Sequence, residues 1–197
     1  MKKIFILILF FTITLTNFNV AYSISPDVFI QSTVNRASQV LSENISKDEK
    51  INKLKLIAKE TVDIRGVGFY SLGAARKNLN NSEKKTYSEL FEKYFLKSFS
   101  SRLAEYTNPE IKVKGKEVLN ENYTLVASVL VGTSERPEVN IDWRVYTKNP
   151  DNPLIRDLII EGLSLARTQK EEFTSILNSN DGDLKVLFKI LEEFSKK

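Results

Sequence analysis

The 197-residue sequence contains no cysteine and no histidine. Without cysteine, disulfides cannot stabilise the fold, and no thiolate is present to attack a substrate or to ligate zinc. The absence of histidine removes the side chain that most often acts as a general base or metal ligand near neutral pH. The chain also lacks a glycine-rich nucleotide loop, an HExxH motif and a GxSxG motif. Most catalytic constellations are therefore excluded, and neither a metal nor a cofactor is expected.

The sequence has little excess charge of either sign. It contains 29 basic and 25 acidic residues, for a formal net charge of +4. Residues 1–23 include two lysines and no acidic residue, so the remaining chain carries a net charge of +2. Basic and acidic residues alternate in segments such as KDEKINKLKLIAKE, residues 47–60, which is typical of a solvated helix face. A nucleic-acid-binding protein would cluster its basic residues, and no nucleic-acid partner is expected.

The longest apolar run lies at the N-terminus. Two lysines precede an apolar stretch over residues 4–15, and a polar segment then ends in the small-x-small pattern of residues 21–23. This order is typical of a secretory signal peptide. Polar residues interrupt the run from Thr16 onward, short of the roughly 20 apolar residues that a membrane-spanning helix needs. We predict that residues 1–23 form a signal peptide cleaved after Ser23 and that residues 24–197 form a single domain.

Helix signals dominate the first half of the remaining chain. Ser25 and Pro26 predict an N-cap followed by proline at the first helical position. A second helix is predicted to begin at the capping box of Ser46 and Glu49. Asp63 is predicted to cap a short glycine-containing helix, and the longest helix is predicted from about Ser82 to Tyr106.

The predicted helix over residues 82–106 carries an unusually aromatic apolar stripe. Its spacing is that of a helix face turned toward an apolar environment. That environment is either a solid core or a cavity lined by some of the rings. The stripe consists of Tyr87, Leu90, Phe91, Tyr94, Phe95, Phe99, Leu103 and Tyr106.

The second half of the chain changes from helical to strand periodicity. Short segments rich in β-branched residues cover 111–115, 122–132, 138–148 and 154–162, and turn signals separate them. The short connections predict an antiparallel meander. Gly162 is predicted to turn the chain into another helix, and a last helix is expected from Leu184 to Phe194. The fold class is α+β, with helices wrapped over a curved antiparallel sheet of about four strands.

Polar residues in the strands give only weak functional signals. Asp142 and Arg144 fall on one face of the third predicted strand, where a cross-strand salt bridge explains them better than catalysis does. Glu161 precedes the corner glycine and has neither a histidine nor a second acid at fixed spacing. A rim charge therefore explains Glu161 better than a catalytic carboxylate, and the protein is not expected to be an enzyme.

Four segments in order carry a resemblance to a known family. They are VDIRGVGFYSLG (Val62–Gly73), YSELFEKYFLKSFSSRLAEY (Tyr87–Tyr106), VNIDWRVY (Val139–Tyr146) and EGLSLARTQKEEF (Glu161–Phe173). In these segments the sequence is similar to the MlaC, or toluene-tolerance, family of periplasmic phospholipid-binding proteins, and the similarity extends from about Val28 to Leu191.

The resemblance implies a periplasmic carrier that shuttles glycerophospholipids between the outer membrane and an inner-membrane ABC transporter. The expected partners are a transporter complex with a lipid-binding MCE domain and an outer-membrane lipoprotein complex. A bound phospholipid would be the cargo, with its acyl chains in an apolar pocket between sheet and helices. We expect a monomer.

The predicted pocket residues combine the family-matched segments with the apolar faces of the sheet and of the long helix. They are Phe69, Tyr70, Phe91, Phe95, Val129, Ile141, Trp143, Ile160 and Leu163. At the rim, the guanidinium groups of Arg144 and Arg167 are candidates to meet a lipid phosphate or an acidic partner.

Two functions from other classes remain as alternatives. A non-enzymatic periplasmic adaptor would use the aromatic stripe as solid core, with no cavity. A small-solute enzyme on a cone-shaped α+β fold would need a polar cluster inside its cavity. The presence of a cavity and the chemistry of its walls therefore discriminate among the three hypotheses.

Overall fold

The computed structural model describes residues 23–134 and 136–196, so the predicted signal peptide lies outside the described residues apart from Ser23. None of the helices in this described part is long and apolar enough to span a bilayer. The helices are α1 (Pro26–Ser42), α2 (Lys47–Thr61), α3 (Ile64–Ser71), the 3-10 helix η1 (Gly73–Asn78), α4 (Asn81–Leu103), α5 (Leu165–Asn178) and α6 (Leu184–Lys196). The strands are β1 (Ile111–Asn120), β2 (Tyr123–Leu130), β3 (Val139–Tyr146), β4 (Leu154–Ile160) and β5 (Leu163–Ser164).

The strands form one antiparallel sheet in the order β1-β2-β3-β4-β5, which confirms the α+β meander. The prediction counted about four strands, and the fifth is the two-residue β5. It arises because the chain reverses at Glu161 and Gly162, whose φ angles are 48° and 80°. Positive φ at both central residues is the signature of a type I′ turn, which suits the twist of a hairpin. The segment predicted as a strand-to-helix corner is therefore a hairpin turn followed directly by α5.

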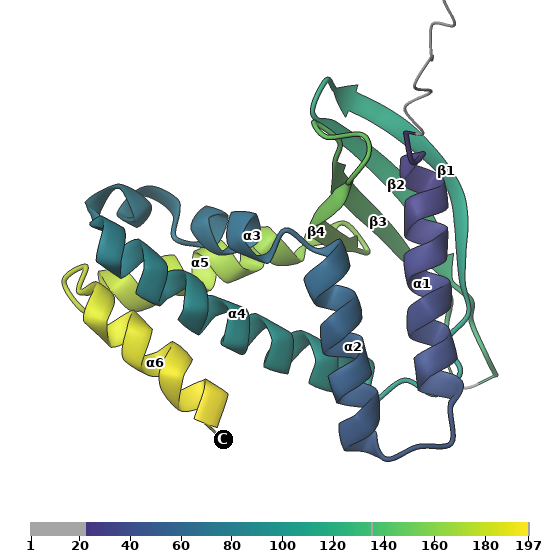
Figure 1. Ribbon diagram of the computed structural model, residues 1–197, viewed down its shortest axis with the longest axis horizontal. Coiled ribbons are helices and arrows are strands. Elements are labelled where there is room, and N and C mark those ends of the chain that lie inside the picture. Colours follow the sequence, from purple (N-terminus) through teal and green to yellow (C-terminus); the bar gives the residue numbers. More distant parts are fainter. Residues whose placement is uncertain (1–22, 135, 197) are drawn as a thin grey trace, which may run out of the picture.

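The helices divide into two groups around the sheet. Figure 1 shows α1 lying along β1 and β2, with α2 beside it, while α3 to α6 form a separate layer that extends away from β4. Helix α4 bridges the groups, because its C-terminal end reaches α2 while its N-terminal half packs against α3 and α6. The sheet and the helical layer therefore meet at an angle, and α4 spans the space between them.

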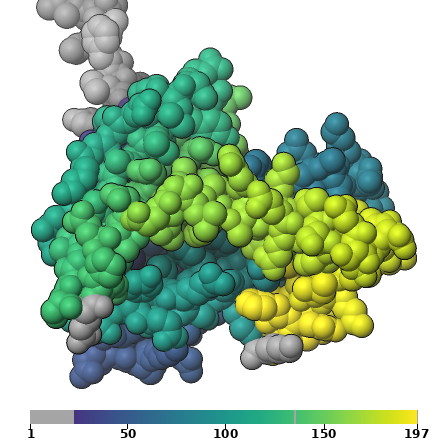
Figure 2. Space-filling model, turned by 180° about the vertical axis from the view of Figure 1, so that it is seen from behind, coloured from purple at the N-terminus to yellow at the C-terminus, as the bar shows by residue number. Residues whose placement is uncertain are grey.

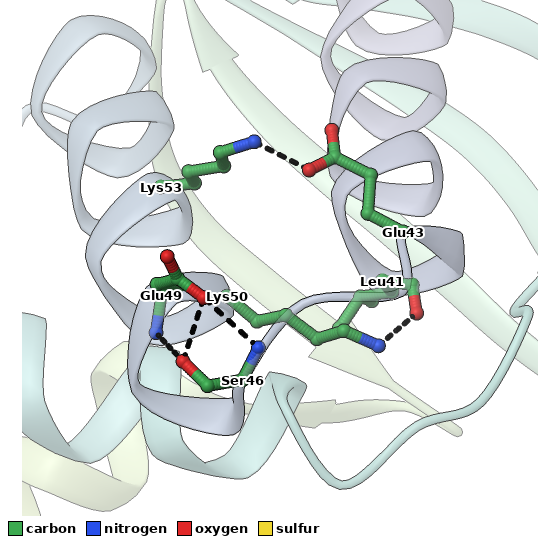
Figure 3. A network of polar contacts seen from close by, with 6 residues as sticks. All are labelled: Leu41, Glu43, Ser46, Glu49, Lys50 and Lys53. Atoms are coloured by element: carbon green, nitrogen blue, oxygen red, sulfur yellow. Dashed lines mark hydrogen bonds and ion pairs between the residues drawn. The ribbon is translucent and has the colours of Figure 1, made fainter.

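The caps of α2 and α4 show why these helices begin where they do. At the start of α2 the Ser46 hydroxyl accepts a hydrogen bond from the Glu49 amide, and the Glu49 carboxylate accepts one from the Ser46 amide at 3.0 Å, as predicted. Lys50 then donates to the Leu41 carbonyl at 2.7 Å, which ties α2 to the end of α1 (Figure 3). Helix α4 begins with a second capping box, between Asn80 and Glu83, that the sequence reading missed.

Buried apolar side chains gather in three clusters. The first lies between α1 and the sheet and contains Ile30, Val34, Val126, Leu130, Ile141, Trp143, Val145 and Ile155. The second joins α3, α4, α5 and α6 and contains Val67, Leu72, Leu79, Tyr87, Phe91, Ala166, Phe173, Leu177, Leu187 and Leu191. A smaller third cluster, between α1 and α2, contains Val40, Leu41, Leu54 and Ile57. The apolar interior is thus not continuous, and a cavity lies between the clusters.

Candidate functional site

A large cavity opens between the sheet and the helical layer. Its volume is about 730 Å³, within the usual range of ligand pockets. Figure 2 shows the molecule hollowed beneath α5, with α4 at the back of the hollow and α6 along one side. We call this space the outer chamber. Its apolar lining consists of Val62, Val67, Phe91, Tyr94, Phe95, Phe99, Trp143, Ile155, Leu158, Leu165, Ala166, Ile190 and Phe194.

A smaller chamber of about 120 Å³ lies deeper, between α1, α2 and the sheet, and we call it the inner chamber. Its walls are almost wholly aliphatic and aromatic, and the polar side chains among them are hydroxyls such as those of Thr33, Ser38 and Thr61. The two chambers share the wall residues Val62, Phe99, Trp143, Ile155 and Leu158. The chambers therefore adjoin at these five residues, which we call the neck, and we call the two chambers together the passage.

A β-bulge in β4 aims two side chains at the neck. Arg144 pairs with Asp157 and Val145 pairs with Ile155, so Arg156 is the extra residue on β4. In a regular strand, residues 155 and 158 would point to opposite faces. The bulge resets the alternation, and both Ile155 and Leu158 line the passage.

Trp143 is held at the neck by a hydrogen bond across the sheet. Its indole Nε1 donates to the Ser128 hydroxyl at 2.8 Å, and that hydroxyl donates in turn to the Ile141 carbonyl at 2.9 Å. A buried indole needs such a partner for its N–H. The ring is thus fixed in orientation while its apolar surface lines both chambers.

Polar side chains border the outer chamber on α4 and α5. Lys97 and Arg102 come from α4, and Gln169 comes from α5. The Tyr94 hydroxyl donates to the Gln169 side-chain oxygen at 3.0 Å and so links the two helices. Burial raises the pKa of Tyr94, and the Glu172 carboxylate raises it further, so this hydroxyl remains a donor at neutral pH. The outer chamber therefore combines an apolar wall with a polar border, which includes Lys97 and Arg102 from α4, Arg156 and Asp157 from β4, and Glu172 from α5.

The start of α5 is attached to β4 by a buried carboxylate. Asp157 is 5% exposed, and its Oδ1 accepts from the Ala166 amide at 3.0 Å while Oδ2 accepts from the Ser164 hydroxyl at 2.6 Å. The carboxylate thus satisfies free donors at a helix N-terminus. Arg144 lies 3.6 Å from the same carboxylate across the sheet. This contact is the cross-strand salt bridge expected of Arg144, and its partner is Asp157 on β4.

Five of the predicted pocket residues lie on the walls of the passage. The structure places Phe91 and Phe95 on the outer chamber, Ile141 and Ile160 on the inner chamber, and Trp143 at the neck. The two α4 rings come from the aromatic stripe. The use of the stripe changes along the helix: Tyr87 is almost fully buried in the second cluster, whereas Phe91, Phe95 and Phe99 line the cavity.

The other four predicted pocket residues lie away from the described cavity walls. Phe69 packs in the helical layer, with its ring centroid 5.8 Å from that of Tyr87. Tyr70 is 42% exposed. Val129 is paired with Asn140 on the opposite face of the sheet from Val126 and Trp143. Leu163 is 59% exposed, because the hairpin turn carries it outward.

The predicted rim arginines line other surfaces. Arg144 borders a groove between the β1–β2 turn and α3, and Arg167 borders a shallow surface along α5. Glu161 is exposed, and its carboxylate accepts from the Asn140 amide at 2.5 Å. None of these three residues is among the described lining of the passage.

Sequence reasoning missed several residues that line the cavity. Phe99 and Arg102 lie on the last turns of α4, where aromatic and cationic residues at helical spacing could have indicated a pocket border. Leu158 was not predicted to line the pocket, because the sequence of β4 does not indicate the bulge that turns this side chain toward the passage. Ile190 and Phe194 belong to α6, whose apolar stripe gives no sign that one edge faces a cavity.

The arrangement offers shape and apolar surface more than reactive groups. The described residues contain no group of three acidic side chains placed to hold a metal ion. The buried carboxylate of Asp157 is committed to the start of α5. A long apolar molecule with one polar end matches these walls, because it can fill the passage and leave its polar end near Lys97 and Arg102.

Comparisons with known proteins identify related sequences and folds. The profile of the family described as MlaC protein matches residues 31–193. A solved structure of a phospholipid-binding protein from Ralstonia solanacearum, in complex with a phospholipid, superposes with a TM-score of 0.73. The superposition covers 88% of this chain and 98% of that chain at 17% sequence identity, which shows a shared fold. A search of curated proteins gave no match.

Proposed function

The chain belongs to the MlaC family, and from this premise we propose that it binds a glycerophospholipid whose acyl chains occupy the two chambers. The observation that carries the proposal is the pair of adjoining, mainly apolar chambers between sheet and helices. The similar fold from Ralstonia solanacearum was solved with a phospholipid, which supports the same class of ligand here.

The physical requirement for a lipid carrier matches the walls of the passage. Two acyl chains expose roughly 30 methylenes in water, each worth about 0.8 kcal/mol, so the gross cost is on the order of 24 kcal/mol. A carrier must replace nearly all of that apolar contact. Apolar surface from two chambers does this without any catalytic group, and we propose a binding protein, with no enzymatic activity and no cofactor.

The head group is proposed to lie at the border of the outer chamber. Lys97 and Arg102 are the cations there that α4 supplies, and the amide of Gln169 adds hydrogen-bonding capacity. Arg156 also lines the chamber, but it is already bound to Asp63 and to the Tyr123 hydroxyl. A guanidinium and an ammonium can both meet a lipid phosphate, and the guanidinium does so with two parallel hydrogen bonds. Of the residues predicted from the sequence, Phe91, Phe95, Ile141, Trp143 and Ile160 are proposed to contact the chains.

We further propose the cellular role that family membership suggests. The protein would act as a monomeric periplasmic carrier that moves glycerophospholipids between the outer membrane and an inner-membrane ABC transporter. Its partners would be the MCE-domain transporter complex and an outer-membrane lipoprotein complex. The alternatives fit the geometry less well. A solid-core adaptor has no use for the passage, and an enzyme would need a polar cluster where the inner chamber has only scattered hydroxyls.

Native mass spectrometry of residues 24–197, purified without detergent, tests the proposed ligand. Adducts with the mass of a phospholipid are expected. A clean unliganded mass after gentle preparation, together with no uptake of lipid from vesicles, would contradict the proposal.

A transfer assay between vesicles tests the head-group position. The double variant Lys97→Gln/Arg102→Gln is expected to slow lipid transfer at least about tenfold, because two charge-assisted contacts are lost. Lys93→Gln/Lys85→Gln removes the same charge from α4 residues that are not among the described cavity lining. This control should transfer lipid at the wild-type rate, and equal slowing in both variants would refute the assignment.

A further inference from the structure

A second concave site adjoins the outer chamber, with which it shares Val67, Arg156, Asp157 and Ala166, and three arginines line it. It is a groove of about 510 Å³ between the β1–β2 turn, the α3–η1 segment and the β3–β4 surface. We call it the arginine groove. Arg76 comes from η1, Arg144 from β3 and Arg156 from β4. Segments far apart in the sequence therefore deliver guanidinium groups to one site, which neither the apolar passage nor the proposed lipid binding explains.

The three arginines differ in the contacts that their guanidinium groups already make within the protein. The guanidinium of Arg156 donates hydrogen bonds to Asp63 at 2.6 Å and to the Tyr123 hydroxyl at 2.6 Å. It also lies over the Tyr146 ring, 3.8 Å from the centroid. Arg144 has only the 3.6 Å contact with Asp157. Among the described residues, Arg76 has no acidic or hydrogen-bonding partner.

Two acids offset part of the positive charge of the groove. Asp157 lies 3.6 Å from Arg144, and Asp63 pairs with Arg156 while it also accepts a hydrogen bond from the Gly66 amide. Three guanidinium groups and two carboxylates leave one net positive charge, that of Arg76. The chain as a whole is close to neutral once residues 1–23 are set aside, so this local excess of positive charge is a feature of the site.

The remaining lining suits a small anion with several acceptor oxygens. The hydroxyls of Tyr70 and Tyr123 and the side-chain amide of Asn120 border the groove beside the guanidinium groups. The groove is concave and open to solvent, and it meets the outer chamber at Val67, Arg156, Asp157 and Ala166. It thus presents planar, multidentate donors at an accessible surface, a geometry that matches phosphate oxygens.

We propose that the arginine groove is a phosphate-binding site, with Arg76 and Arg144 as the residues that bind the anion. Arg156 acts as a positioning residue that holds Tyr123 at the border of the groove. Free phosphate or phosphomonoesters, and phosphate head groups at a bilayer surface, are the two sources of this chemistry.

Isothermal titration calorimetry of residues 24–197 with inorganic phosphate, at constant ionic strength, tests the site. Saturable binding is expected in the wild-type protein, and Arg76→Gln or Arg144→Gln should each weaken it at least about tenfold, the effect of losing one charge-assisted hydrogen bond. Arg36→Gln is the matched control, because Arg36 is a surface residue of α1 paired with Glu60 far from the groove. It should change the affinity less than twofold.

Several results would overturn the proposal. One is the absence of saturable phosphate binding by the wild-type protein. Another is equal weakening in all three variants, which would show an effect of net charge alone. Displacement of phosphate by an acidic peptide at concentrations far below those of phosphate would assign the groove to a protein partner instead. Circular dichroism confirms that each variant is folded, as expected, since Asp157 keeps its Ser164 and Ala166 donors without Arg144.

A second experiment, with vesicles, distinguishes free phosphate from phosphate head groups as the ligand. Flotation with vesicles containing phosphatidic acid, compared with phosphatidylcholine alone, reports head-group binding. Vesicle binding that Arg76→Gln and Arg144→Gln abolish assigns the site to head groups, and binding of phosphate with no vesicle association assigns it to free phosphate. Native mass spectrometry on the same variants should show unchanged phospholipid adducts, so failure of the groove proposal is separable from failure of the proposed lipid cargo.

Discussion

The Ser128 hydroxyl and the Trp143 indole Nε1 are 2.8 Å apart and form a buried hydrogen bond between neighbouring strands. Trp143 is the only tryptophan in the sequence and lies at the neck between the chambers. One hydroxyl thus fixes the ring that faces both halves of the passage.

The first prediction concerns that hydroxyl. Ser128→Ala leaves a buried indole N–H without an acceptor, and we expect the free energy of unfolding to fall by about 1–3 kcal/mol. Ser100→Ala is the matched control. Ser100 is fully buried, and its hydroxyl has no partner in the described structure, so its removal should be neutral or stabilising. Urea denaturation of both variants measures the difference, and equal losses would show that the hydrogen bond contributes nothing.

The second prediction compares two leucines near the end of β4. Leu158 lies at the neck, whereas Leu163 is exposed on β5. Leu158→Glu places a carboxylate against the acyl chains, which costs several kcal/mol unless it takes up a proton. We expect this variant to purify without phospholipid and Leu163→Glu to retain it.

Lipid extraction and circular dichroism on the same samples check this comparison. If Leu158→Glu fails to fold, Leu158→Trp supplies the test, because the larger ring obstructs the neck without adding charge. Full lipid content in a folded Leu158→Glu protein would contradict the position of the chains, and loss of lipid from Leu163→Glu would return that residue to the pocket.

The third prediction concerns acid stability. Hydrogen bonds from Lys116 and then from Ser25 lower the pKa of Asp27 to about 2. A lowered carboxyl pKa adds stability above the unfolded-state pKa, and this contribution is lost as the pH falls through the folded-state value. The side chains are about one-third exposed, so the pair is worth only about 1 kcal/mol.

Asp27→Asn should therefore reduce the free energy of unfolding by that amount at pH 6, with the difference shrinking below about pH 4 and vanishing only below pH 2. Chemical denaturation at a series of pH values measures it. A constant difference across the whole range would show that the ion pair does not cause the effect. Glu60→Gln, which breaks the more exposed pair with Arg36, is a control expected to have a smaller effect.

The fourth prediction concerns the empty state. Dry cavities cost about 24 cal/mol per Å³, so an empty outer chamber of about 730 Å³ would cost on the order of 17 kcal/mol, more than a typical domain can bear. The stripped protein must therefore hydrate or contract this space. We expect delipidated protein to melt at a lower temperature than lipid-loaded protein. Identical melting curves from differential scanning calorimetry would rule out a large ligand-filled pocket.

The fold class was predictable because its signals are local. Ser46 with Glu49 and Asp63 with the following turn mark helix starts through bonds that span three residues. In β3, the alternation of apolar and polar residues correctly identified the face that carries Trp143. Such features depend on neighbours in the chain, and the sequence displays them directly.

The pocket was less predictable because its lining depends on the register between strands and on the face of the sheet to which each side chain points. The apolar residues of β2 occupy both faces, so nothing in the sequence distinguished Val129 from Val126. The bulge at Arg156 reverses the face of Leu158, and the type I′ turn at Glu161 carries Leu163 outward. Each of these features is set by pairing between strands, and periodicity within one strand does not report it.

The meander order of the sheet has a consequence for how the passage opens. Every strand pairs with its neighbour in sequence. The sheet is therefore built from local hairpins, which form early in folding because closing a short loop costs little conformational entropy. Helices α1 and α2 attach to it over much longer stretches of chain, through contacts such as Gln31 with Val113 and the bridge of Val62 with Ile155. A unit held by such distant contacts can detach while the sheet stays intact. We therefore expect α1 and α2, which form one wall of the inner chamber, to open more readily than the sheet, and hydrogen exchange in both helices should become faster when lipid is removed.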